Sequence, residues 1–483
     1  MRSFRKNLAS VYLVTTVNGI LGIAFVPLAV KLLGLDGYGL YSMYAVMASY
    51  VALVDLGVSK YFVLQLSKEK EASIKTRHFQ TALGIYLVLS ALLFLSLPLL
   101  LYLIPKYILS VPGENISALR WIVFFSIIEY FLAIPSALRQ MSCVSNERFD
   151  RYSLFTFTSG LYRYALMFLG IFVFGTPAAV VGLVVSRRFL DIVTSRFILG
   201  ALPRGSFIAK LDFKGMKTII GRSSTLSVSQ LFQSTVVSIG SILVNRYSGL
   251  NGLGIYRSAF DLSNKIWFIS NGIGLVVFPR FVRMLSEKVH RARLFSRILW
   301  LLNTSWAGYS LLAVCGMVIA PRALSIIGLS GSDSVQLFVL LLLGVSWNAH
   351  ANLSYEFLQA AGRFRQAAVL SAFSLLVMVA CFYILYGSTG ILAIGWAWII
   401  SQAIYAYLAD ALTISISELP VQPIMLMFKS IVGGGALLVV SERLGHSSNI
   451  AMITGSLIVI VCSCWAFYEY KGSLKKAEIS RYA

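Results

Sequence analysis

The chain has 483 residues, of which 58% are hydrophobic and 12% are charged, and it carries a net charge of +22. Soluble proteins average roughly 45–50% apolar and about 25% charged residues, so the composition excludes an ordinary soluble domain. Runs of about 20 apolar residues, the length that crosses a bilayer, recur along the whole chain. The basic residues alternate with these runs and form no continuous surface, which argues against nucleic acid as a partner.

The hydropathy pattern predicts fourteen membrane-spanning helices joined by short loops, and hence an all-α polytopic membrane protein. In chain order they cover residues 8–33, 40–66, 79–104, 118–142, 153–175, 177–200, 218–244, 254–279, 298–320, 334–360, 367–387, 390–412, 424–441 and 450–470. The first follows a basic leader but is too long for a signal peptide, so we expect it to be retained. Glycine and proline mark several turns, as at residues 175–177 and 387–390.

The loops are strongly asymmetric in charge. The segments on the side of the N-terminus hold 25 lysine and arginine residues, and the opposite loops hold four. Because cytoplasmic loops of membrane proteins are enriched in these residues, both termini are predicted to be cytoplasmic. We therefore expect a multi-pass protein of the bacterial cytoplasmic membrane whose basic loops contact acidic lipid headgroups. An attraction for an anionic substrate is the alternative interpretation of these loops.

A short sequence occurs twice. Residues 34–41, Gly-Leu-Asp-Gly-Tyr-Gly-Leu-Tyr, return at 249–256 as Gly-Leu-Asn-Gly-Leu-Gly-Ile-Tyr. The first copy joins predicted helices 1 and 2, and the second joins helices 7 and 8. We expect turn chemistry at these octapeptides, with helix-ending glycines at positive φ and others that permit close helix approach; a flexible hinge is the alternative. The glycines concerned are Gly34, Gly37, Gly39, Gly249, Gly252 and Gly254.

The repeat defines a predicted domain organisation. Six helices return the chain to its starting side, so two repeats run parallel. The predicted parts are an N-lobe at 1–200, a cytoplasmic linker at 201–217, a C-lobe at 218–412, helices 13 and 14 at 424–470, and a basic cytoplasmic tail at 471–483.

Three features carry a resemblance to a known family. Pro27, the Leu-Gly-x-x-x-Tyr-Gly-x-Tyr turn at 33–41 and Asp55-Leu56-Gly57 are similar to the start of the Wzx-type polysaccharide flippases. These belong to the superfamily that also contains lipid II flippases and multidrug-and-toxin extruders. The resemblance implies two six-helix lobes around a central cavity, and a lipid-linked oligosaccharide as substrate.

Several charged residues fall inside the predicted spans, where they are costly and are functional candidates by default. Arg257, Asp261 and Lys265 are spaced four apart, which predicts one helix face reaching the midplane. Because arginine binds phosphate oxygens bidentately, a basic cavity suits a pyrophosphate group. Internal ion pairs that fasten helices are the alternative. The candidates for pyrophosphate binding are Arg257, Lys265, Arg163, Lys60, Arg187 and Arg188.

Acidic residues in the spans are candidates for ion coupling by H⁺ or Na⁺, or for structural pairing: Asp261, Asp55, Glu129, Glu356 and Asp410. His350 is interpreted as a satisfied polar residue in preference to a proton relay. The five cysteines show neither a disulfide framework nor metal-ligand spacing, and no ATP-binding loop is present. We therefore predict no cofactor, no metal and no catalytic residue.

Taken with the resemblance, these residues predict a flippase for an undecaprenyl-pyrophosphate-linked oligosaccharide, acting by alternating access in surface-polysaccharide synthesis such as that of O-antigen. Its expected partners are the lipid-linked glycan, membrane lipids, a coupling H⁺ or Na⁺ and other polysaccharide-assembly proteins. A multidrug or cation antiporter of the same superfamily is the first alternative, although the net-positive eighth span argues against it. A membrane glycan polymerase or ligase is more remote, because the outward loops are short.

Overall fold

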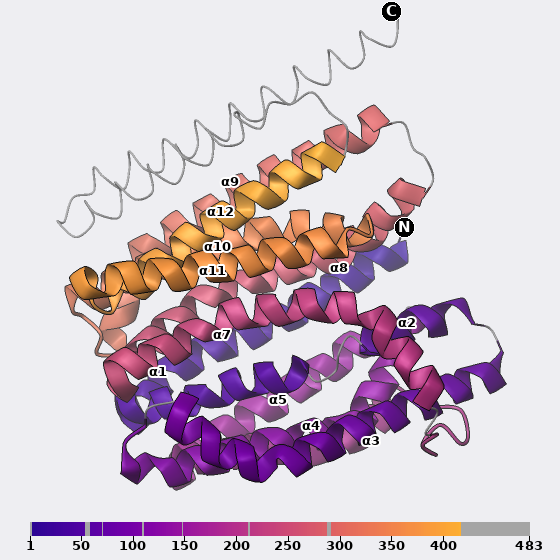
Figure 1. The fold of residues 1–483 in the computed structure, drawn as a ribbon, viewed down its shortest axis with the longest axis horizontal. Coiled ribbons are helices and arrows are strands. Elements are labelled where there is room, and N and C mark those ends of the chain that lie inside the picture. Colours follow the sequence, from indigo (N-terminus) through magenta and orange to yellow (C-terminus); the bar gives the residue numbers. More distant parts are fainter. Residues whose placement is uncertain are drawn as a thin grey trace, which may run out of the picture. The chain divides into compact units, whose positions relative to one another are not determined.

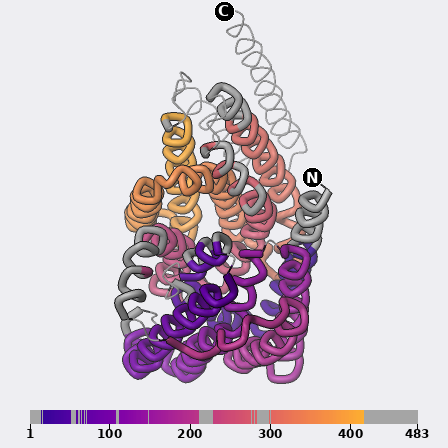
Figure 2. Tube along the Cα trace, turned by 90° about the vertical axis from the view of Figure 1, so that its right-hand side faces the viewer, coloured from indigo at the N-terminus to yellow at the C-terminus, as the bar shows by residue number. Residues whose placement is uncertain are grey.

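The computed structural model describes residues 2–416 apart from 54–57, 70, 109–110, 147, 211–212 and 287–290. Within this range the chain is helical, with long helices that run alongside one another in each of two compact units (Figure 1, and turned by 90° in Figure 2). The units are residues 1–258 and 259–483. Predicted helices 13 and 14 (424–470) and the tail at 471–483 lie outside the described residues.

The helices of the first unit follow the predicted spans. They are α1 (Arg2–Leu53), α2 (Val58–Lys68), α3 (Ala72–Leu103), η1 (Ile104–Ile108), η2 (Gly113–Asn115), α4 (Ile116–Ser145), α5 (Phe149–Phe174), α6 (Pro177–Ile198) and α7 (Phe213–Ser263), of which α7 crosses into the second unit. α1 contains predicted spans 1 and 2 up to residue 53, on either side of a kink at Gly34. α7 likewise joins predicted span 7 to the start of span 8 across a kink at Gly249.

The second unit continues with η3 (Asn264–Ile266), α8 (Trp267–Ser286), α9 (Arg291–Ile326), α10 (Ser332–Ala360), α11 (Phe364–Thr389) and α12 (Leu392–Ile416). Among the described residues, eight helices are long and apolar enough to cross a membrane. The chain is therefore an all-α, multi-pass membrane protein. The described residues of the twelve predicted spans before residue 413 lie almost entirely in helices.

Local sequence explains where several helices end. Gly175 closes α5 in the left-handed region (φ 61°), and Pro177 begins α6 at a position where its missing N–H is not needed. Gly390 also has a positive φ (56°) at the end of α11. The glycine-marked turn predicted at 175–177 is confirmed, whereas α11 continues through residues 387–389, so that the turn predicted at 387–390 begins only at Gly390.

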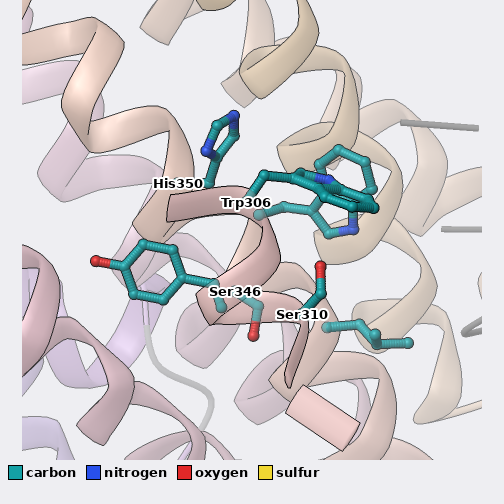
Figure 3. Close-up of a pocket in the computed structure, with 7 residues that line it drawn as sticks. Trp306, Ser310, Ser346 and His350 are labelled. Carbon is teal, nitrogen blue, oxygen red and sulfur yellow. The ribbon is translucent and has the colours of Figure 1, made fainter. Parts of the chain in front are cut away.

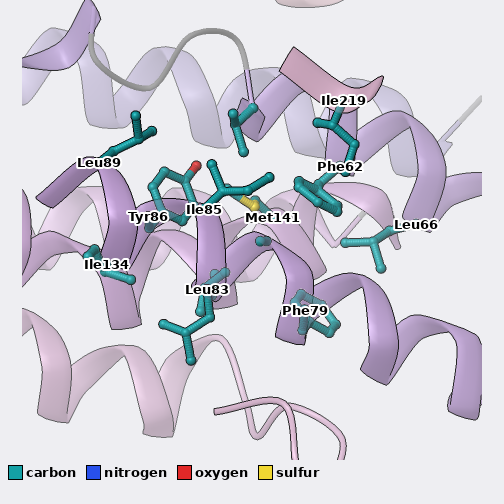
Figure 4. Packing of buried hydrophobic residues seen from close by; sticks show 13 residues of the cluster. Phe62, Leu66, Phe79, Leu83, Ile85, Tyr86, Leu89, Ile134, Met141 and Ile219 are labelled. Carbon is teal, nitrogen blue, oxygen red and sulfur yellow. The ribbon is translucent and has the colours of Figure 1, made fainter. Parts of the chain in front are cut away.

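The first unit has an aromatic and aliphatic core where α2, α3 and α4 meet. Figure 4 shows Phe62 and Leu66 of α2 packed with side chains of α3 and α4, and Ile219 of α7 joins them. The segment after α6 is held against α3, since Gln80 Nε2 donates to Gly205 O at 3.2 Å and Lys210 N donates to Gln80 O at 3.1 Å. Part of the predicted linker is thus docked on a helix.

In the second unit α10 is the central helix and contacts α8, α9, α11 and α12. In its most apolar 18-residue window, 78% of the residues are buried, compared with 17% in the corresponding window of α3. Glycines allow α10 and α12 to pack closely. Gly344 of α10 lies against Trp398 of α12, and Gly395 of α12 lies against Leu340 of α10. α3 instead exposes large apolar side chains such as Leu95, as expected of a helix that faces lipid.

Candidate functional site

The charged residues of α6 form a cluster with an acid on α4. Arg187 Nη2 and Arg188 Nη2 lie 2.9 and 2.7 Å from the same oxygen of Glu129, and Arg188 Nη1 lies 3.2 Å from Asp191. Glu129 and Asp191 are 7% and 0% exposed. Paired charges at such depth offset each other's loss of hydration, which isolated charges cannot do. The sequence predicted these charges but not this pairing of Arg187 and Arg188 with Glu129.

Two further helices complete this group, which we call the Glu129 cluster: Tyr44, Glu129, Ser159, Arg163, Arg187, Arg188 and Asp191. Tyr44 of α1 donates a short hydrogen bond to Glu129, and Arg187 Nη1 donates to Ser159 Oγ of α5 at 3.1 Å. Arg163, one turn after Ser159, interacts electrostatically with Tyr44 and Glu129. Its Nε is buried and has no hydrogen-bond partner among the described residues.

The Glu129 cluster keeps an excess of positive charge. Three guanidinium groups share two carboxylates, Glu129 and Asp191, within one four-helix arrangement of α1, α4, α5 and α6. A buried charge is stabilised by a neighbour of opposite charge. The excess of positive charge therefore favours the binding of an anion such as a phosphate group. The arrangement can therefore fasten these helices and attract an anion at Arg163.

The residues of the predicted eighth span are placed one by one. Arg257, at the end of the first unit, is 6% exposed, and its Nη1 lies 3.5 Å from Ser241 Oγ. In the second unit Asp261 accepts from Asn264 at 3.4 Å, and the Lys265 ammonium lies 5.6 Å from the Phe268 ring centre. Lys265 occupies the 3₁₀ turn η3, so the uninterrupted α-helix predicted through it is wrong at this point, and the strict four-residue spacing on one face ends there.

The remaining predicted residues are less informative. Glu356 lies on α10 near Gly274 of α8. Asp55 falls outside the described residues, and Lys60 lies in α2 at a position where the side chain is not described. The described residues contain no group of three histidine, cysteine or acidic side chains that could hold a metal ion.

Asp410 belongs to a second polar group, which we call the His350 cluster: Ser305, His350, Ser354 and Asp410. His350 Nε2 lies 2.8 Å from Asp410 Oδ2, and its Nδ1 lies 2.8 Å from Ser305 Oγ. Ser354 donates a short hydrogen bond to the other oxygen of Asp410. The cluster joins α9, α10 and α12. The sequence reasoning missed it, although His350 and Ser354 stand four apart and so share a helix face.

The two octapeptides touch each other inside the first unit. A Cβ added at Gly39 would lie 2.5 Å from Leu250 O, and one added at Gly254 would lie 2.1 Å from Leu35 O. The contact is reciprocal, because Leu35 and Gly39 correspond to Leu250 and Gly254 in the repeat. Such exchange of contacts marks a local two-fold relation. The predicted close approach at these glycines is confirmed.

The first glycine of each copy has an unusual backbone conformation. Gly34 has φ 72° and ψ 173°, and Gly249 has φ 66° and ψ −169°, a region open almost only to glycine. The positive φ predicted at Gly34 and Gly249 is confirmed. The hinge interpretation of these positions and of Gly37 and Gly252 stays a prediction.

Comparison with known proteins places this fold. Residues 4–285 match the family described as "Polysaccharide biosynthesis protein". A "Putative O-antigen transporter" of Shigella flexneri is 20% identical over 386 residues, covering 78% of this chain and 89% of that protein.

Two solved structures extend the likeness to almost the whole chain. The lipid II flippase MurJ in an inward closed conformation matches with a TM-score of 0.68 at 14% identity, covering 97% of this chain and 99% of that one. An inward-facing MATE-family multidrug transporter matches with a TM-score of 0.67 at 13% identity, covering 85% and 96%. The resemblance to the Wzx-type flippases is therefore confirmed, and because the family match spans more than half of its sequence, the chain belongs to the polysaccharide biosynthesis protein family.

Proposed function

We propose that this protein is a flippase that moves an undecaprenyl-pyrophosphate-linked oligosaccharide across the bacterial cytoplasmic membrane for surface-polysaccharide synthesis. The observation that carries the proposal is the combination of membership in a polysaccharide biosynthesis family with a fold that matches a lipid II flippase over 97% of the chain. The relative from Shigella flexneri, named as a putative O-antigen transporter, supports the same substrate class.

Buried basic residues supply the chemistry that this substrate requires. A pyrophosphate entering a low-dielectric interior needs guanidinium or ammonium partners to replace water. Arg257 is one such partner and is buried, and Arg163 and Lys265 are half-buried partners of the same kind. In the proposed mechanism these residues hold the pyrophosphate, the glycan crosses through the protein and the polyprenyl chain stays in lipid. Arg187 and Arg188 act chiefly by keeping Glu129 paired and the Glu129 cluster positive.

Alternating access supplies the movement. Two lobes with the boundaries 1–200 and 218–412 rock against each other, and the reciprocal contact of the octapeptides is their pivot. Because backbone touches backbone at Gly39 and Gly254, rotation about this contact changes little of the local packing. Both termini are cytoplasmic in this arrangement, and a cation gradient drives the cycle.

The test of the substrate site is a double neutralisation, Arg257→Gln with Lys265→Gln. Removal of both charges leaves the pyrophosphate without these partners, so cells that depend on the variant should lose surface glycan while the protein still inserts. Surface glycan is measured by lectin or antibody labelling, and membrane protein by immunoblot. Arg322→Gln, at an exposed position, is the matched control and should retain export. Normal export by the double variant would contradict the assignment.

The MATE-family neighbours support a second candidate, an ion-coupled multidrug antiporter, because the match to the inward-facing MATE structure has almost the same TM-score as the match to the flippase. Purified protein in liposomes separates the two. We expect translocation of a lipid-linked oligosaccharide, detected by its accessibility to an external glycosidase, and no accumulation of cationic dyes. Dye accumulation without oligosaccharide translocation would favour the antiporter.

A further inference from the structure

We propose that the His350 cluster is a proton-binding site, and that the proton it takes up is the ion that drives transport. The second half of this inference rests on the proposed function, whereas proton binding itself does not. The cluster lies within the second unit, and none of its four residues is among those assigned to the pyrophosphate.

The hydrogen bonds of His350 leave it two complete arrangements that differ by one proton. Its Nε2 faces the Asp410 carboxylate, and its Nδ1 faces the Ser305 hydroxyl, each at 2.8 Å. The same hydroxyl also lies 2.9 Å from Leu302 O. A serine has one hydroxyl proton, so it cannot donate to Nδ1 and to Leu302 at once.

These two arrangements define the proton step. In the first, Ser305 donates to Nδ1 and a neutral His350 donates from Nε2 to the Asp410 carboxylate. In the second, a proton from water has bound at Nδ1, the hydroxyl has rotated to donate to Leu302 O, and its oxygen accepts from Nδ1–H. Every polar atom stays bonded in both, so uptake requires only the rotation of one hydroxyl.

Charge balance gives this proton a reason to bind. With a neutral imidazole the buried pair of His350 and Asp410 carries a charge of −1, and with the added proton it is neutral overall. The two side chains are 5% and 4% exposed. The described residues place no lysine or arginine within ion-pair distance of Asp410. A proton bound at His350 therefore leaves this buried pair without net charge.

A small pocket lies beside His350. It is lined from α9 by Trp306, Tyr309 and Ser310 and from α10 by Leu343, Ser346, Trp347 and His350. Figure 3 shows His350, Trp306, Ser310 and Ser346 around this pocket. Ser310 and Ser346 contribute hydroxyl groups to this lining.

Other titratable groups are carried by the helices that pack against the pair. Tyr309 of α9 lines the same pocket as His350, and Glu356 of α10 lies toward α8 at Gly274. The further titratable or charged groups on these helices include Tyr355 of α10, Arg280 and Arg283 of α8, Arg322 of α9, Arg363 and Arg365 beside and on α11, Cys381, Tyr383 and Tyr386 of α11, and Tyr405 and Tyr407 of α12. Of the described titratable side chains on these helices, Asp410 alone lies within ion-pair distance of the imidazole.

The position of the cluster allows proton binding to bias conformation. His350 and Asp410 tie α10, the central helix, to α12, and Ser305 ties it to α9. A change in proton occupancy alters the charge at this junction of three helices. A site couples to transport when its proton affinity differs between the two conformations.

Proton binding is tested first, without any substrate. Detergent-solubilised protein in weakly buffered solution is titrated with acid, and ring signals of labelled histidine are followed by NMR in a variant whose other three histidines, His78, His290 and His446, are changed to Gln. The His350 ring should gain one proton, and Asp410→Asn should remove this transition. Ser325→Ala, at an exposed position of α9 outside both the pocket and the cluster, is the control and should leave the transition in place.

Coupling is tested in liposomes that carry a lipid-linked oligosaccharide and an imposed pH gradient. The gradient should accelerate translocation by the wild type, and this acceleration should be lost in His350→Gln and Ser305→Ala, with residual gradient-independent translocation. Ser305→Ala removes only a hydroxyl, so it keeps the assay informative if other variants fold poorly.

Two outcomes would overturn the inference, and a third would overturn only its coupling half. A His350 ring that keeps one protonation state over the range in which transport responds to pH excludes a proton site in the wild type itself. If variants of the cluster have a lower melting temperature but translocation is still fully accelerated by the pH gradient, the cluster only stabilises helix packing. If the wild type translocates no lipid-linked oligosaccharide in any condition while His350 still binds a proton, the proposed function and the coupling role are wrong. The assignment of the proton site would then still hold.

Discussion

At the scale of single residues, the buried charges of the first unit are organised around one acid. Glu129 accepts from Arg187, Arg188 and Tyr44, which come from two other helices. Removing one member of a buried ion pair costs more than the pair contributes, because the remaining charge is left without a partner. Glu129 is therefore the residue on which the pairing of α1, α4 and α6 depends.

The change Glu129→Gln should destabilise the protein strongly. It leaves two guanidinium groups without their shared carboxylate, and breaking a buried pair in this way costs about 3–5 kcal/mol. Thermal unfolding in detergent measures the loss. Glu114→Gln, on the exposed turn η2, should leave the melting temperature unchanged. Equal stability of the two variants would mean that the arginines find other partners.

At the scale of elements, the helices meet through glycines at a few close approaches. The octapeptides bring backbone against backbone at Gly39 and Gly254, and α10 meets α12 at Gly344 and Gly395. Membrane helices gain little from apolar burial against each other, since lipid is equally apolar. Close approach through small residues increases dispersion contacts instead, so a single methyl group at such a position has a large effect.

Gly254→Ala should disrupt the contact between the octapeptides, because the new Cβ would lie 2.1 Å from Leu35 O. Overpacking of this kind typically costs about 1–3 kcal/mol. If this contact is the pivot, Gly254→Ala should reduce glycan export by more than its loss of stability explains. Surface labelling measures export, and thermal unfolding measures the stability of the same variant.

The control for this change is Gly308→Ala on α9, where an added Cβ has no atom within 4 Å and should leave both readouts intact. Gly34→Ala separates backbone conformation from packing. It too meets no atom within 4 Å, but its φ of 72° strains an alanine. Full activity of Gly254→Ala would exclude the pivot.

At the scale of the whole molecule, the loop charges set an orientation that can be measured. With 25 basic residues on one side of the spans and four on the other, the side of the N-terminus should be cytoplasmic. Residue 113, between α3 and α4, is an exposed position on the predicted outward side. Residue 209, in the segment after α6, is an exposed position on the predicted cytoplasmic side.

In a variant without its five cysteines, Gly113→Cys should react with a membrane-impermeant maleimide added to intact cells, because residue 113 belongs to a loop predicted to face outward. Ala209→Cys should react only after the membrane is permeabilised. Both positions are exposed, so accessibility to the reagent differs only by side. Labelling of residue 209 in intact cells would invert the topology.

The sequence by itself determined the secondary structure and much of the local chemistry. Span lengths and helix-ending glycines depend on properties that act within a few residues, and so the twelve described spans and the positive φ at Gly34 and Gly249 could be predicted. The repeat also predicted close approach at Gly39 and Gly254, but not that the two copies would meet each other.

Only the tertiary structure decided which buried polar groups are partners. Glu129 and Arg187 are 58 residues apart, and His350 and Asp410 are 60 apart. Such pairs depend on how helices rotate and pack, which residue spacing within one helix does not specify. For this reason Arg187, Glu129 and Asp410 could be predicted from the sequence only as separate candidates. The folded chain joins them into clusters that link three or four helices each.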